Sequence, residues 1–431
     1  MIEYRNKAGQ YLLDTAIFNG KNKDLELSFS AVCDKACYYC YLKDFGQYLY
    51  PACNKEQILN NLEKFLNYLY EKDYRFDCID LFSGEFFALS YWSDVLDILL
   101  NAKFKNYNRI MIPTNFSFVE RDILNDIIDY QRKFIGVGKK LSLSCSIDGE
   151  NDYETRPYKV NSVFNISNIK DAAKLTCSGF HPMVSPKFLE DYKSNVDFWI
   201  NTTLEFNDSP MLLEVRNDFW DDEALNNLSE FLYYLAEQFY TRVFNNDADI
   251  FAKVFFDTDK AYSKYSSFIL TFPRILQRMS CSFQSTVFVR VSDLALIPCH
   301  RLSYPQFIYG QFVPDGNSLR FESKNLDFHI TATTMNPSSF LPKCANCSIK
   351  AFCNKGCLGA QFEVNEDPFI PIESVCRLHK VKYVTLHRIA KKYGLYDIYF
   401  NDPLLSPEDE AATRYIVSAL NKLEEEIENE E

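Results

Sequence analysis

Three cysteines near the start of the chain are spaced so that their thiolates can bind one inorganic cluster. Cys33, Cys37 and Cys40 follow a segment with the alternating pattern of a strand, in the order Cys-x3-Cys-x2-Cys. Three thiolates from one loop can hold three irons of a four-iron cubane, which leaves the fourth iron open to another ligand. The alternative is a zinc loop that lacks its fourth ligand. Zinc sites with three cysteines usually add a nearby histidine, and no histidine precedes His181.

A second group of cysteines lies late in the chain. Its members are Cys281, Cys299, Cys344, Cys347, Cys353, Cys357 and Cys376. The run that begins at Cys344 reads Cys-x2-Cys-x5-Cys-x3-Cys, and such paired spacing is used both by iron–sulfur clusters and by structural zinc. Zinc therefore stays open as the alternative from this group alone. The scattered cysteines are expected to be small buried apolar residues: Cys53, Cys78, Cys145 and Cys177.

The composition is that of a folded, acidic protein. The 431 residues suffice for two to three domains, and the net charge is −13. An acidic surface repels phosphate backbones, so we expect no nucleic acid as a partner. The sequence contains neither a run of about 18 apolar residues nor a secretory signal pattern, so we expect no membrane contact and a cytoplasmic location. Because the cytosol keeps thiols reduced, the 14 cysteines point to cluster or metal binding rather than to disulfides.

Strand and helix patterns alternate through the first 210 residues. The strand patterns cover residues 25–30, 78–82, 109–112 and 141–144, and the helix patterns cover residues 55–72 and 92–100. This alternation predicts parallel βα units in an open sheet or partial barrel. Active sites of such folds gather at the C-terminal ends of the strands. The chemical motifs of this half of the chain fall at those ends.

The first cysteine group, with Tyr39 directly before its third cysteine, resembles the signature of the radical S-adenosylmethionine (SAM) superfamily. The resemblance implies a [4Fe–4S] cluster whose open iron is chelated by the amino and carboxylate groups of the methionine of SAM. One electron from the cluster then cleaves the sulfonium, and the resulting 5′-deoxyadenosyl radical abstracts a hydrogen atom from the substrate. The implied fold is α/β, a partial (βα)6 TIM-like barrel of the radical SAM type. The implied electron donor is a protein such as flavodoxin or ferredoxin.

Further motifs of this resemblance follow the later strand patterns. Ser83-Gly84-Glu85-Phe86 stands where the superfamily has Gly-Gly-Glu-Pro, a motif that binds the methionine amino group, and Glu85 can make a charge-assisted hydrogen bond to an ammonium. An Asp-Gly pair after a strand, such as the one at Asp148, is by itself usually only a turn. The residues that the resemblance assigns to SAM binding are Tyr39, Ser83, Gly84, Glu85, Thr114, Asn115, Ser146, Asp148 and Arg156.

The second cysteine group is similar to the SPASM extension of radical SAM enzymes that mature peptides and proteins. The resemblance assigns Cys344, Cys347, Cys353 and Cys376 to one auxiliary [4Fe–4S] cluster, and Cys281, Cys299 and Cys357 to another. The implied cofactors are therefore SAM and three [4Fe–4S] clusters. Leu294 stands where the extension has a glycine, five residues before its second cysteine.

His300 is the candidate catalytic residue, because it directly follows Cys299. In the related sulfatase-maturing enzymes, the residue after this cysteine is an acid that deprotonates the substrate. A neutral imidazole near pH 7 can accept a proton in the same way. The alternative is a structural histidine, which is the more common role for a histidine that stands alone.

The leading hypothesis is a radical SAM oxidoreductase or maturase of the SPASM type. It would abstract a hydrogen atom from a peptide or protein residue, followed by thioether or other crosslinking, oxidation or epimerisation. The alternatives are a radical SAM enzyme that acts on a small metabolite, and an iron–sulfur scaffold without catalytic activity. The expected domains are an N-terminal segment (1–22), the partial barrel (23–210), a bridging region of helical pattern (211–280), the SPASM domain (281–380) and C-terminal helices with an acidic tail (381–431).

Overall fold

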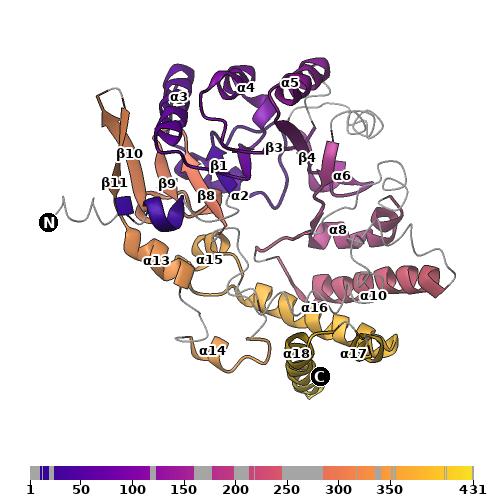
Figure 1. The fold of residues 1–431 in the computed structure, drawn as a ribbon. Coiled ribbons are helices and arrows are strands. Elements are labelled where there is room, and N and C mark those ends of the chain that lie inside the picture. Colours follow the sequence, from indigo (N-terminus) through magenta and orange to yellow (C-terminus); the bar gives the residue numbers. More distant parts are fainter. Residues whose placement is uncertain are drawn as a thin grey trace. The chain divides into compact units, whose positions relative to one another are not determined.

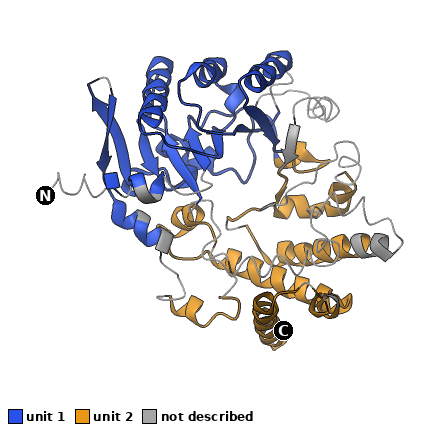
Figure 2. Cartoon of the chain, viewed as in Figure 1, with its two compact units in different colours: residues 1–146, 156–179, 282–334 blue, residues 147–155, 180–281, 335–431 orange. Residues whose placement is uncertain are grey.

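The computed structural model divides into two compact units, which Figure 2 shows in different colours. Unit 1 comprises residues 1–146, 156–179 and 282–334, and unit 2 comprises residues 147–155, 180–281 and 335–431. The structure describes residues 10–11, 13–18, 24–116, 123–159, 177–198, 213–217, 219–244, 285–316, 318–334, 341–350, 353, 356–401, 403 and 405–429. Residues 281–380, which the sequence groups as one domain, contribute to both units.

Unit 1 is built on a sheet in the order β11-β10-β9-β8-β1-β2-β3-β4-β5 (Figure 1). Its strands are β1 (Asp24–Ser28), β2 (Cys78–Phe82), β3 (Arg109–Thr114), β4 (Lys140–Cys145), β5 (Cys177–Phe180), β8 (Thr286–Arg290), β9 (Ala295–Ile297), β10 (Gly310–Asp315) and β11 (Ser318–Ser323). Strands β1 to β4 are parallel, and β8 pairs parallel with β1 on its other side. Strands β8 to β11 pair antiparallel with one another.

Strand β1 is covered on both faces, as a central parallel strand should be. Leu25 and Leu27 are fully buried on one face. Glu26 and Ser28 alternate with them and are also buried, at 6% and 0% exposure. The sheet therefore buries a carboxylate and a hydroxyl on its second face, and both recur in the site described below.

The helices of the first half begin and end close to their predicted bounds. Helix α3 (Lys55–Glu71) starts at Asn54, whose side chain accepts a hydrogen bond from the backbone N–H of Gln57 at 2.8 Å. Its buried face includes Leu62 and Phe65. Helices α4 (Trp92–Asn101) and α5 (Leu124–Gly136) follow it along the sheet (Figure 1). The predicted pattern of parallel strands and connecting helices is confirmed by these elements.

Unit 2 is mostly helical. It contains a two-stranded parallel sheet of β6 (Met183–Val184) and β7 (Leu213–Glu214). Its described helices are α6 (Asp152–Thr155), α8 (Pro186–Glu190), α10 (Asp222–Phe244), α14 (Pro342–Ala345), α15 (Leu358–Asn365), α16 (Glu373–Lys392), α17 (Leu395–Phe400) and α18 (Pro407–Glu428). Helix α16 packs against α10 and α18. The apolar run at residues 268–273, which ends the predicted bridging region, lies outside the described residues.

Within the described parts of the chain, every helix is too short or too polar to span a membrane.

Candidate active site

The loop that carries the first three cysteines connects β1 to helix α2 (Tyr41–Leu49) in unit 1. Cys37 is buried, and Cys33 and Cys40 are half-buried. The backbone N–H of Cys40 donates to the Cys37 carbonyl at 3.0 Å, and the N–H of Lys35 donates to the Cys33 sulfur at 3.4 Å. These local bonds hold the cysteines in one tight loop at the C-terminal end of the strand.

The Ser83-Gly84-Glu85 motif is bonded directly to the start of this cysteine loop. The backbone N–H of Gly84 donates to the Ser30 carbonyl at 2.9 Å, and the N–H of Glu85 donates to the Val32 carbonyl at 2.8 Å. The Ser83 hydroxyl donates to the Ser30 carbonyl, also at 2.9 Å. The serine that departs from the family pattern thus adds a bond to the same loop.

Gly84 is required by the closeness of the two loops. A Cβ atom at this position would lie 2.5 Å from the Val32 carbonyl oxygen and 2.7 Å from the Ala31 carbonyl oxygen. Both obstacles are backbone atoms, so a side chain at residue 84 would force the cysteine loop to move.

The carboxylate of Glu85 accepts three hydrogen bonds and is 1% exposed. The Thr114 hydroxyl donates at 2.9 Å and the backbone N–H of Phe87 donates at 3.1 Å, both to Oε1. The backbone N–H of Asn115 donates to Oε2 at 2.7 Å. Burial raises the pKa of Glu85 to about 7, although the Asn115 N–H lowers it. A positively charged ligand group at this carboxylate would oppose that rise, so the site suits an ammonium.

Asn115 links this carboxylate to the cysteine loop. Its side-chain amide nitrogen lies 3.0 Å from the Asp34 carboxylate and 3.6 Å from the Cys33 sulfur. The next residue, Phe116, is fully buried and has a φ of 60°. A left-handed conformation at a bulky residue is strained, and it occurs here where β3 ends at the site. Asp34 was missed by the sequence interpretation, which considered only the cysteines and Tyr39 of this loop.

Two further predicted SAM-binding residues of unit 1 contact each other. The Tyr39 hydroxyl accepts a hydrogen bond from the Arg156 guanidinium at 2.9 Å, and Arg156 is 8% exposed. The segment after Arg156 also holds the cysteine loop, because the Ala36 N–H donates to the Pro157 carbonyl at 2.7 Å. The backbone N–H of Ser146 donates to the Thr114 carbonyl at 2.9 Å.

Asp148 belongs to unit 2 and has a structural role there. Its carboxylate accepts a hydrogen bond from the Met183 N–H at 3.0 Å, and its own N–H donates to the Asp152 carboxylate at 2.8 Å. These bonds tie the turn after β4 to strand β6. The turn that the Asp-Gly pair predicts is therefore present, and one Asp148 oxygen is used to hold it.

His300 is fixed by a buried carboxylate on β1. Its Nδ1 atom lies 3.1 Å and 3.0 Å from the two oxygens of Glu26. The ring stacks on Phe82 with centroids 4.1 Å apart and planes 9° apart. Glu26 also accepts a hydrogen bond from the Ser28 hydroxyl at 2.8 Å. The sequence interpretation missed Glu26, because a polar residue is ordinary at its position in an alternating strand pattern.

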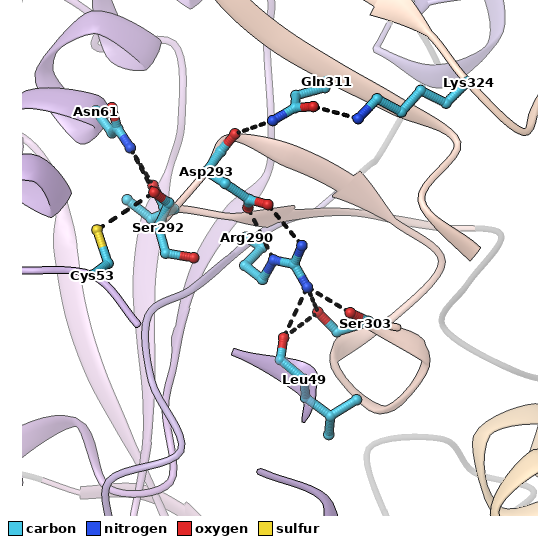
Figure 3. A network of polar contacts seen from close by, with 10 residues as sticks. Leu49, Cys53, Asn61, Arg290, Ser292, Asp293, Ser303, Gln311 and Lys324 are labelled. Carbon is cyan, nitrogen blue, oxygen red and sulfur yellow. Dashed lines mark hydrogen bonds and ion pairs between the residues drawn. The ribbon is translucent and has the colours of Figure 1, made fainter. Parts of the chain in front are cut away.

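Leu294, which stands where the SPASM extension has a glycine, has a φ of 55°, in the left-handed region that favours glycine. Figure 3 shows how polar contacts brace this turn before Cys299. The Arg290 guanidinium forms two bonds to the Asp293 carboxylate, at 2.9 Å and 2.7 Å, and donates to the Leu49 carbonyl at 2.9 Å. The tight turn therefore forms without a glycine.

Unit 2 contains a cavity of about 170 Å³ that five of the late cysteines line. These are Cys344, Cys347, Cys353, Cys357 and Cys376. Burial, with a smaller contribution from the nearby thiols of Cys353, Cys344 and Cys347, raises the pKa of the Cys376 thiol to about 11 against the opposing effect of Lys343. The four cysteines that the resemblance assigns to one auxiliary cluster thus lie close together around one cavity.

The other predicted auxiliary ligands are distributed differently. Cys299 is half-buried in unit 1 and packs beside Phe288 and Ile297. Cys281 lies outside the described residues. Within the part of the chain that is described, no three His, Cys, Asp or Glu side chains are grouped as the site of a single metal ion. Of the scattered cysteines, Cys78 and Cys145 are buried, Cys53 is half-buried, and the side chain of Cys177 is not among those described.

The fold is found in solved structures of peptide-modifying enzymes. The sulfatase-maturing enzyme anSMEcpe with bound S-adenosylmethionine aligns over 91% of this chain and 98% of its own, at 15% identity and a TM-score of 0.56. Native anSMEcpe with S-adenosylmethionine and the Cp18Cys peptide aligns over 87% and 98%, at 15% identity and a TM-score of 0.55. SuiB of Streptococcus suis bound to the precursor peptide SuiA aligns over 86% and 80%, at 14% identity and a TM-score of 0.50.

No family model and no curated protein matches the sequence. The structural likeness nevertheless establishes the class of fold, which is that of radical SAM enzymes with a SPASM extension. The fold class predicted from the sequence, an α/β partial barrel with a C-terminal extension, is confirmed.

Proposed function

We propose that this protein is a radical SAM enzyme that abstracts a hydrogen atom from a residue of a peptide or protein. The observation that carries the proposal is the bonding of the Glu85 loop to the loop of Cys33, Cys37 and Cys40. This arrangement places a buried carboxylate suited to an ammonium beside three cysteines suited to a cubane cluster. The neighbours that bind peptides in their crystal structures support a peptide or protein as the substrate.

The residues fit the implied cofactors. Cys33, Cys37 and Cys40 would hold the radical SAM cluster, and Glu85 would bind the amino group of SAM, with Tyr39, Ser83, Gly84, Thr114, Asn115, Ser146, Asp148 and Arg156 completing the cofactor site. Bound together, cluster and SAM supply a 5′-deoxyadenosyl radical. Thr114 and Asn115 orient the Glu85 carboxylate through the bonds described above, and Asn115 keeps it in register with the cysteine loop.

The late cysteines would hold two auxiliary [4Fe–4S] clusters. Cys344, Cys347, Cys353 and Cys376 would bind one of them at the cavity of unit 2, and Cys281, Cys299 and Cys357 would bind the other. An electron donor such as flavodoxin or ferredoxin would reduce the protein in the cytoplasm. The likeness to SPASM folds supports this assignment, and the closeness of four thiols around one cavity supports the first cluster in particular.

We propose His300 as the proton acceptor for the substrate. Glu26 fixes the ring through Nδ1, which leaves Nε2 as the nitrogen that can accept a proton. The subsequent modification would be thioether or other crosslinking, oxidation or epimerisation.

Two measurements test the function. Anaerobically reconstituted protein with dithionite and SAM should release 5′-deoxyadenosine, whereas a protein that only carries clusters should not. Incubation with short peptides encoded beside its gene, deuterated at their Cα and side-chain positions, should then transfer deuterium into 5′-deoxyadenosine. Release without transfer from any peptide, together with transfer from a small metabolite, would favour the metabolite-modifying alternative.

A further inference from the structure

His379 lies on α16 one turn after Cys376, so the two side chains share a face of the helix. Both residues line the cavity that the late cysteines surround. His379 is 4% exposed, and its Nε2 atom is buried without a hydrogen-bond partner among the residues that the structure describes. A buried imidazole nitrogen in this state is unfavourable, so a polar group that reaches it stabilises the site.

Burial and nearby cations keep the His379 ring neutral. Burial first, and then the Arg216 guanidinium, lower the pKa of His379 to about 3 against the opposing effect of Glu214. Lys382 acts in the same direction as Arg216 and forms an ion pair with Glu214. A neutral imidazole carries one N–H group and one bare nitrogen. His379 can therefore donate one hydrogen bond, but it does not act as a counter-ion.

We infer that the Nε2–H group of His379 donates a hydrogen bond to a sulfur atom of the auxiliary cluster bound by Cys344, Cys347, Cys353 and Cys376. The inference rests on the proposed function, which places a cluster in this cavity. Hydrogen bonds to the sulfur atoms are one of the means by which proteins set the reduction potential of such clusters. A donor stabilises the reduced cluster, which carries more negative charge, and so raises the potential.

Direct ligation of iron by His379 is the competing role. A cubane cluster takes four protein ligands, and the four cysteines assigned to this cluster all line the cavity. Because four thiolates complete the ligand set, the histidine is not needed as a ligand. Its role is to adjust the potential of the cluster through a hydrogen bond, without contact with the substrate.

The test uses full-length protein that retains only this cluster. Replacing Cys33, Cys37, Cys40 and Cys299 by Ala removes ligands of the other two clusters. In this background, His379→Leu removes the donor, whereas His379→Gln keeps a side-chain N–H group. We expect His379→Leu to shift the midpoint potential in an EPR-monitored redox titration to more negative values, with iron content unchanged. His379→Gln should restore part of the shift.

A matched control is available on the same helix. His387 is fully buried, bonds to the Tyr396 hydroxyl at 2.7 Å and to Asn421 at 3.0 Å, and does not line the cavity. His387→Leu should leave the potential unchanged. An equal shift in both leucine variants would overturn the inference, because loss of any buried histidine of α16 would then produce it.

Three other results would also overturn the inference. An unchanged midpoint potential in His379→Leu would show that His379 donates no hydrogen bond to the cluster. Loss of iron from His379→Leu, together with an EPR signal of a three-iron cluster, would show that His379 is a ligand of the cluster. A background variant without any iron refutes the inference together with the auxiliary cluster of the proposed function, whereas the first two results leave that cluster in place.

Discussion

The carboxylate of Glu85 accepts a hydrogen bond from the backbone N–H of Asn115 at 2.7 Å. Asn115 also donates from its side chain to Asp34, which directly follows Cys33. One residue at the end of β3 therefore contacts both the proposed SAM-binding carboxylate and the cysteine loop. The two halves of the proposed site are connected through it and through the bonds of Gly84 and Glu85 to the same loop.

Replacement of this carboxylate should weaken SAM binding without loss of the cluster. In Glu85→Gln, one charge-assisted hydrogen bond to the ammonium is lost, which amounts to about 1.5–3 kcal/mol, or about 10- to 150-fold in the dissociation constant. Calorimetric titration of reconstituted protein with SAM measures the effect. Glu56→Gln, at an exposed position of α3, is the control. Equal affinities of wild type and Glu85→Gln would contradict the role assigned to Glu85.

The affinity for SAM should depend on pH through the same residue. Burial raises the pKa of Glu85 to about 7, so half of the carboxyl groups are protonated near neutral pH. Only the ionised form attracts an ammonium, so the affinity should fall as the pH drops below 7, approaching tenfold per pH unit. Titrations between pH 6 and 8 measure the slope. The slope should be absent from Glu85→Gln, and a slope that persists there belongs to another group.

The cluster assignment predicts the iron content. Three cubane clusters contain about twelve irons per chain. Replacing Cys33, Cys37 and Cys40 together by Ala should remove about a third of the iron and abolish the release of 5′-deoxyadenosine. A triple replacement of the scattered cysteines Cys53, Cys78 and Cys145 should leave the iron content unchanged. Zinc as the dominant metal in anaerobically purified protein would disprove the assignment.

Loss of the Glu26 carboxylate should lower the rate of peptide modification and leave the rate of SAM cleavage unchanged. Glu26→Gln removes the carboxylate that orients His300, and loss of a partner that orients a proton acceptor lowers turnover by about 10- to 100-fold. Peptide modification and 5′-deoxyadenosine release are measured side by side. Glu63→Gln, on the exposed side of α3, serves as the comparison. A parallel loss of both activities would show that Glu26 acts on the SAM site instead.

The left-handed turn at Leu294 predicts an unusual order of stabilities. Leu294 is 3% exposed, so truncation to Ala should cost about 2–5 kcal/mol of the free energy of unfolding. Truncation to Gly loses the same contacts but relieves the strain of the positive φ, which is about 1–2 kcal/mol. Urea denaturation should therefore find Leu294→Gly more stable than Leu294→Ala. The opposite order is the normal one for a buried position, and finding it would mean that the turn carries no strain.

The parts of the molecule that follow from local sequence were predictable. The alternation from Leu25 onward gives β1, and the apolar spacing from Lys55 gives α3 within one residue of its end. The spacing of Cys33, Cys37 and Cys40 likewise predicts a cluster, because these three ligands come from one loop. The hydrogen bond between Tyr39 and Arg156, 117 residues apart, was not predicted, because the resemblance only assigned each residue to SAM binding.

Contacts between distant segments account for what the sequence left out. Glu26 contacts His300, which lies 274 residues later in the chain, and no local sequence pattern in either segment predicts this contact. Glu426, in the acidic tail, lines the cysteine cavity and accepts a hydrogen bond from Ser348 at 2.6 Å, 78 residues earlier in the chain. The burial and pairing of these side chains depend on the assembled fold. Composition and periodicity describe only local segments, so they do not predict such contacts.

The crowding around Gly84 has a consequence for recognising distant relatives of this protein. Backbone carbonyls exclude any side chain at residue 84, whereas Ser83 and Phe86 are accommodated where the radical SAM motif Gly-Gly-Glu-Pro has glycine and proline. Steric tolerance is therefore uneven along the four positions of the motif. A search pattern that demands all four residues discards chains of this kind. One that fixes only the second glycine and the glutamate, at a set distance after the cysteine loop, retains them.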